Sequence, residues 1–213
     1  MTCFLSGFEY TGVTVKTIKN LILTVLTSVV LIVAVGLFFS SANGEAVVPM
    51  QFFEARVKAS DSAKNLAQLV DSSLLNLNKV KQWAEERKIA PALDLIQFEL
   101  TNSRERQNVA ISLSKSLEQM AHSTAGMSPD KAERLAVEAV STGVNMVSQL
   151  ISYNDLLNQL LVILQSKLNN GEDLGTEQIS QIVNDMNSVA REINTLSGKF
   201  NDLIDSFDKK YID

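Results

Sequence analysis

Apolar residues recur at alternating spacings of four and three through most of this 213-residue chain. The pattern begins with Ala59, Ala63, Leu66 and Val70 and is still present at Tyr211. A heptad pattern of this kind places apolar side chains along one side of an α-helix, and that stripe has to pack against another helix to leave water. No stretch alternates as a half-buried strand would. The sequence therefore predicts an all-α fold.

Three breaks divide the pattern into helices of similar length. They are KIAP at 88–91, AGMSPD at 125–130 and NNGEDLGT at 169–176, and they contain the Pro, Gly, Ser and Asn residues typical of helix ends. We expect helices at about 50–88, 92–123, 129–169 and 176–212. Short connections favour antiparallel neighbours, so the predicted fold is an elongated up-down-up-down four-helix bundle of about 50–60 Å with heptad packing. A pair of long antiparallel hairpins is the alternative.

The second of these stretches has the least regular stripe. The apolar face predicted for it consists of Leu93, Ile96, Leu100, Ala110, Leu113, Leu117 and Met120. The polar segment TNSRERQN, residues 101–108, interrupts this face.

An uncharged apolar segment precedes the bundle, at residues 21–39. As a helix it would be about 28 Å long, which matches a bilayer core. Lys16 and Lys19 before it, with Glu45 and Glu54 after it, favour a cytoplasmic N-terminus. The predicted organisation is a cytoplasmic segment at 1–20, a transmembrane helix at 21–39, a linker at 40–49 and an extracytoplasmic bundle at 50–213.

The same segment also has features of a cleaved signal peptide. Small residues follow it at 40–42 (SSA) and 44–46 (GEA), where a signal peptidase could cut. The apolar run and the segment before it are both longer than is usual for a signal peptide, which favours the anchor. Cleavage would give a secreted protein instead.

Composition argues against several classes of function. The formal net charge of −5 is the wrong sign for binding a nucleic-acid backbone. His122 is the single histidine and Cys3 the single cysteine, so paired imidazole ligands and an internal disulfide are excluded. We expect no catalytic residues, no metal site and no cofactor, and therefore no enzyme.

Polar residues are predicted to meet at one height of the bundle. At 1.5 Å per residue, several of them lie about 30–37 Å from the same end. The predicted layer comprises Ser73, Ser103, Gln107, Asn154, Arg191 and Asn194. Such a layer either fixes the register of the helices or binds a small polar ligand.

The third predicted helix carries more apolar residues than one stripe requires. The additional residues are Leu156, Leu160, Val162 and Ile163. They predict either an interface with a protein partner or a second copy of the chain, or a helix that is buried on several sides.

Two resemblances bear on function. The helix number and length are similar to those of the extracytoplasmic sensor modules of chemoreceptors, which continue into a second transmembrane helix that is not found here. Residues 190–207, AREINTLSGKFNDLIDSF, resemble the final helix of the LemA family of single-pass membrane proteins. The Trp- and Arg-rich first helix of that family has no counterpart at 62–88, so we attribute this similarity to heptad spacing. The expected function is a membrane-anchored structural, scaffold or accessory subunit, with a ligand-sensing module as the alternative.

Overall fold

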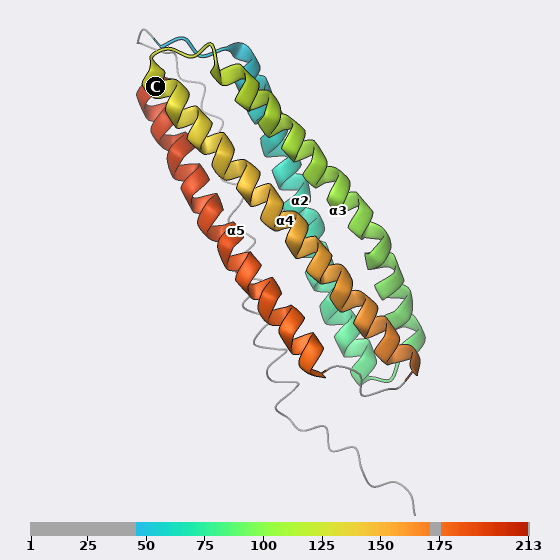
Figure 1. Cartoon of the computed structure of the whole chain (residues 1–213). Coiled ribbons are helices and arrows are strands. Elements are labelled where there is room, and N and C mark those ends of the chain that lie inside the picture. The colour runs from blue at the N-terminus through green and yellow to red at the C-terminus, as the bar shows by residue number, and fades with distance from the viewer. Residues whose placement is uncertain (1–45, 171–175, 213) are drawn as a thin grey trace, which may run out of the picture.

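The computed structural model describes residues 46–170 and 176–212. Four helices account for most of this part of the chain: α2 (Met50–Glu85), α3 (Ile89–Thr124), α4 (Asp130–Asn170) and α5 (Thr176–Tyr211). Successive helices pack side by side and run in opposite directions, and the end of α5 lies at the same end of the bundle as the start of α2 (Figure 1). The expectation of an all-α fold with four helices is confirmed. Segments 1–20 and 21–39 lie outside the described residues.

The turn between α2 and α3 differs from the sequence-based boundaries. Helix α2 ends at Glu85 rather than at 88, because Arg87 adopts a left-handed conformation with φ of 59°. The Arg87 and Lys88 amides donate to the carbonyls of Ala84 and Trp83, at 3.1 and 2.8 Å. This is the Schellman arrangement, with arginine where glycine is usual. It completes the turn within three residues.

Helix α3 consequently begins at Ile89 rather than at 92. Pro91 falls in its first turn, where the backbone nitrogens have no partner within the helix. The proline therefore does not delay the start of the helix, as the sequence analysis had assumed.

The opposite end of the bundle is joined by a short backbone pairing. Val47 and Ser128 exchange two N–H to O=C hydrogen bonds of 3.0 Å, which connect the segment before α2 to the loop between α3 and α4. Nearby, Phe52 of α2 packs against Phe207 of α5, with ring centres 5.5 Å apart. Both Nη atoms of Arg56 donate to the Asp208 carboxylate at 2.7 Å. These contacts tie the first described helix to the last.

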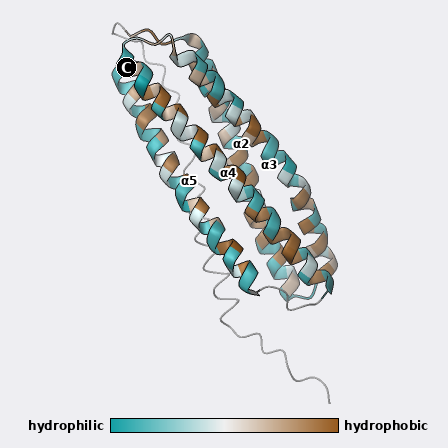
Figure 2. Ribbon diagram, in the orientation of Figure 1, coloured by the Kyte–Doolittle hydropathy of each residue, from teal (hydrophilic) through white to brown (hydrophobic). Residues whose placement is uncertain are grey.

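Apolar and polar residues alternate along every helix, as Figure 2 shows, and the apolar ones form two core clusters within the described residues. The cluster nearest the α2–α3 turn includes Leu77, Ile96 and Leu161. The other cluster, nearest the start of α2 and the end of α5, includes Phe52 and Leu117. On α3 the apolar residues of the two clusters are separated by a stretch of buried polar side chains.

Side chains of α3 and α5 approach the backbone of α4 closely at one glycine. A Cβ atom built on Gly143 would lie 2.9 Å from Cδ2 of Leu117 and 3.3 Å from Cε2 of Phe200. Only a residue without a side chain leaves these two apolar groups in place. At Gly198, in contrast, nothing lies within 4 Å of the added atom.

Candidate functional site

The largest fully buried side chain in the described structure is a charged one, Arg106 of α3. Its Nη1 lies 3.1 Å from Oε2 of Glu99, two turns earlier on the same helix, and both side chains are 1% exposed. A buried charge is costly unless it is paired and its remaining polar atoms are hydrogen-bonded. The surroundings of the pair therefore decide whether it stabilises the bundle.

Neighbouring helices supply those hydrogen bonds. Nε of Arg106 donates to Oδ1 of Asn154 at 2.9 Å, and Nη1 also donates to the hydroxyl of Ser73. Nη2 donates to the backbone carbonyl of Glu99 at 3.4 Å. On the other side, Nδ2 of Asn76 donates to Oε1 of Glu99 at 2.6 Å. The ion pair is thus held by side chains from α2 and α4.

Ser103 extends the cluster toward α4. It accepts hydrogen bonds from Nδ2 of Asn154 at 3.1 Å and from Nδ2 of Asn158 at 2.6 Å. We call this set the polar network: Ser73, Asn76, Glu99, Ser103, Arg106, Asn154 and Asn158. It connects α2, α3 and α4, and in the described part of the chain no residue of α5 hydrogen-bonds to it.

Three of the six predicted layer residues meet in this network. Ser73, Ser103 and Asn154 are buried and hydrogen-bonded to it or within it. Gln107 is exposed and lines an adjoining cavity. On α5, Arg191 is exposed and Asn194 half-buried, and neither side chain hydrogen-bonds to the described network.

The sequence analysis missed the ion pair itself because it misplaced the stripe of α3. The buried positions are Ala92, Ile96, Glu99, Ser103, Arg106, Ala110, Leu113, Ser116, Leu117, Met120 and Thr124. All of them except Ser116 follow the alternation of four and three. Leu93 and Leu100, which were assigned to the face, are only half-buried. Continuing the spacing through the charged residues would have identified both Glu99 and Arg106.

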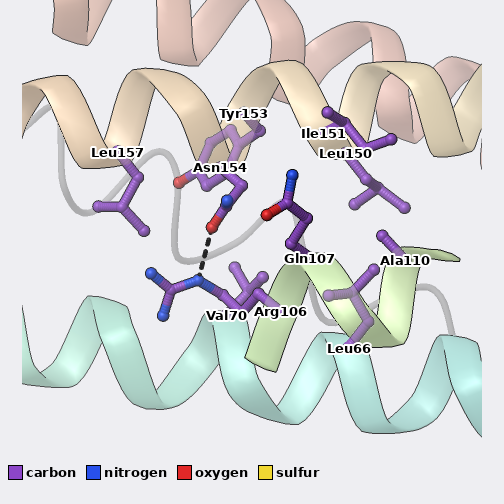
Figure 3. Close-up of a pocket in the computed structure, with 10 residues that line it drawn as sticks. All are labelled: Leu66, Val70, Arg106, Gln107, Ala110, Leu150, Ile151, Tyr153, Asn154 and Leu157. Carbon is purple, nitrogen blue, oxygen red and sulfur yellow. Dashed lines mark hydrogen bonds between the residues drawn. The ribbon is translucent and has the colours of Figure 1, made fainter. Parts of the chain in front are cut away.

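A small cavity of about 10 Å³ adjoins the network, lined by residues of α2, α3 and α4. Arg106, Asn154, Gln107 and Tyr153 line it together with apolar residues, and Figure 3 shows the hydrogen bond from Arg106 to Asn154 across this region. This volume is about that needed to hold one water molecule. The cavity is therefore too small for an amino acid, a sugar or a nucleotide.

Tyr153 is the unusual residue of the cavity. It is 3% exposed, and among the described residues its hydroxyl has no hydrogen-bond partner. Burial raises the pKa of Tyr153 far above its ordinary value, an effect that the charge of Arg106 partly opposes. Burial also lowers the pKa of Arg106, and the neighbouring Glu99 carboxylate acts in the opposite direction. Arginine stays protonated at neutral pH, so the network contains a charged guanidinium.

Most of the additional apolar residues predicted on the third helix, which is α4, are buried or half-buried in the core. Leu160 is 7% exposed and belongs to the core, while Leu156 and Ile163 are half-buried and pack against it. Val162 is 53% exposed. Of the four residues of the predicted interface, Val162 is thus the one that stands on the surface.

Comparison with protein families, with characterised proteins and with solved structures gave no match. Within the described residues, no helix is long and apolar enough to cross a membrane, and no group of three or more acidic, histidine or cysteine side chains is placed to hold a metal ion.

Proposed function

We propose that this chain is a membrane-anchored, extracytoplasmic helical bundle that acts as a structural, scaffold or accessory subunit through contacts with other proteins or with copies of itself. The observation that supports this function best is the polar network around Arg106, in which side chains of α2 and α4 hydrogen-bond to the buried ion pair. Its donors are directed at Glu99, Ser73 and Asn154 within the bundle. Polar groups that are already paired with one another fix the relative positions of helices, and a rigid bundle suits a protein that presents surfaces.

The contacts in this proposal are made by the outer faces of the helices. Large apolar side chains stand on these faces, among them Phe98 of α3 at 54% exposure and Val162 of α4 at 53%. Single exposed apolar residues are common on soluble proteins. The proposal therefore rests on the rigidity that the polar network gives the bundle. The exposed apolar residues are positions at which the proposal can be tested.

Replacement of Val162 tests self-association. We expect Val162→Glu to lower the mass of the oligomer, measured by light scattering after size exclusion, while helicity by circular dichroism is unchanged. Gln159→Glu, at an exposed position on the same helix, adds the same charge and is the matched control. A mass that stays the same in both variants would argue against association through this face.

The membrane anchor is tested separately. Intact mass spectrometry of the protein from native membranes, combined with carbonate washing, should give an uncleaved chain in the pellet. A soluble protein that begins near Asn43 or Val47 would instead identify residues 21–39 as a signal peptide and the bundle as a secreted protein.

Binding of a small polar ligand is the second candidate. The unpartnered hydroxyl of Tyr153 favours it. Because the adjoining cavity has room for about one water molecule, a larger ligand would have to displace the side chains that line it. A ligand at free concentration c that binds only the folded state raises the free energy of unfolding by RT ln(1 + c/Kd), so the melting temperature rises with the logarithm of its concentration above Kd. A thermal-shift screen of small polar compounds distinguishes a sensor, which should respond, from a scaffold, which should not.

A further inference from the structure

The two ends of the bundle differ in where their charged residues lie. At the end where the described chain enters, residues 46–50, 125–129 and 211–212 include no charged residue, and the acidic residues Glu45, Asp130 and Asp213 border them in the sequence. At the opposite end, the α2–α3 turn consists of Glu85, Glu86, Arg87 and Lys88, all of them exposed. Charged residues are the usual occupants of exposed turns, so the exposed apolar residues Val47 and Met50 are the less common feature of this end.

The uncharged residues lie together at one end of the bundle, which we call the uncharged end (Figure 1). The Val47–Ser128 backbone pairing joins its first two segments. Tyr211 packs against Phe207, with ring centres 5.6 Å apart, and both belong to the apolar cluster nearest this end. Met50 and Val47 project from it, with exposures of 68% and 60%, the largest among the exposed large apolar residues of the described structure.

The short linker between the apolar segment and the bundle limits which end of the bundle can lie near the membrane. Residues 40–46 are the seven that separate the apolar segment, which ends at 39, from Val47. Seven residues span at most about 25 Å even when fully extended. Helix α2 has 36 residues and is about 54 Å long, so the charged turn lies well beyond that reach.

The margin of the uncharged end has the composition of a membrane interface. Lys209 and Lys210 are exposed in the last turn of α5, and Nζ of Lys210 lies 5.5 Å from the centre of the Tyr211 ring. Tyrosine and lysine side chains favour the boundary between lipid headgroups and water, because each combines an apolar body with a polar tip.

From these observations we infer that the uncharged end rests on the bilayer surface, with Val47 and Met50 in the headgroup region and the charged turn directed away from the membrane. The inference rests on the proposed membrane anchor and extends it, since a tether alone would let the bundle tumble freely or lie flat.

Fluorescent labelling of the full-length chain in phosphatidylcholine vesicles tests the orientation. In a Cys3→Ser background, Met50→Cys and Val47→Cys place an environment-sensitive dye at the uncharged end. Ala90→Cys, exposed in the first turn of α3, places the same dye beside the charged turn. We expect blue-shifted emission and quenching by lipids with spin labels near the headgroup at Met50 and Val47, and neither effect at Ala90.

Other outcomes separate the two proposals. If the vesicles retain the chain through carbonate washing but the dye at Met50 and Val47 stays in water, the inference is overturned while the anchor stands. Quenching at all three positions also overturns it, because the bundle would then lie flat. If the chain is washed from the vesicles, the membrane anchor fails, and the inference fails with it.

Discussion

The ion pair between Arg106 and Glu99 gives the sharpest test of how this bundle is held together. Arg106→Met removes the positive charge and keeps an unbranched, flexible side chain, which is shorter than that of arginine. The Glu99 carboxylate, which is 1% exposed in the structure, then keeps the Asn76 amide as its side-chain hydrogen-bond partner. Breaking one side of a buried pair typically costs about 3–5 kcal/mol, because it leaves an uncompensated charge in the core.

Urea unfolding followed by circular dichroism measures this loss. With a slope of about 2 kcal/mol per molar urea, the midpoint should fall by about 1.5–2.5 M. Glu99→Met should have a comparable effect, since it leaves the guanidinium with neutral partners. Lys199→Met is the control: Lys199 and Glu138 pair at 2.9 Å with more than half of each side chain exposed, and such pairs contribute at most about 1 kcal/mol.

The double variant Glu99→Met/Arg106→Met separates stability from specificity. It leaves no buried charge, and Ser73 keeps its hydrogen bond to the carbonyl of Leu69 while Asn154 keeps Ser103. We expect the double variant to recover at least half of the stability lost by either single variant, because well-packed apolar residues often replace a buried pair without loss. A loss below about 1 kcal/mol in Arg106→Met would refute the reasoning, since the pair would then be accessible to water. Broadened NMR lines in a stable double variant would show that the network determines helix register.

Two further sites make independent predictions. Tyr153→Phe should leave stability at pH 7 unchanged or slightly higher, because the deleted hydroxyl has no partner among the described residues. The raised pKa of Tyr153 means that its contribution is complete below the unfolded value of about 10 and is lost as the pH rises toward the folded value. The wild type should therefore lose up to about 1.4 kcal/mol per pH unit above pH 10 that Tyr153→Phe does not lose, as measured by urea unfolding from pH 9 to 11. Gly143→Ala and Gly198→Ala both gain about 1 kcal/mol of helix propensity, but the first forces a methyl group against Leu117 and Phe200. Gly198→Ala should be the more stable of the two by about 1–3 kcal/mol, and equal melting curves would show that these neighbours move aside freely.

The number of helices could be predicted from sequence because it depends on local signals. Heptad spacing and the Pro, Gly and Ser residues at the breaks are visible in the chain itself. The turn at Arg87 could not be predicted in the same way, because the Schellman motif usually has a glycine at this position. The nearby Pro91 also led the sequence analysis to place the start of the second helix after it.

Contacts across helices depend on rotation about each axis, which height along the bundle does not determine. Ser73, Ser103 and Asn154 were predicted to meet and do so, whereas Arg191 lies at a similar height and faces solvent. Glu99 was overlooked because a charged residue is normally taken to mark the outer face of a helix. At Glu99 the heptad spacing indicated burial correctly, although the residue is charged.

The arrangement of the network has a consequence for the order in which the bundle assembles. All of its residues belong to α2, α3 and α4, so each partner of Arg106 is present before α5 has been synthesised. The contact between Arg56 and Asp208, in contrast, joins residues 152 positions apart and can form only when the chain is almost complete. Closing so long a loop is entropically unfavourable until most of the structure exists. A nascent chain can therefore align α2, α3 and α4 first and pack α5 against them last. The amide protons of α5 should then exchange with solvent more readily than those of the other three helices.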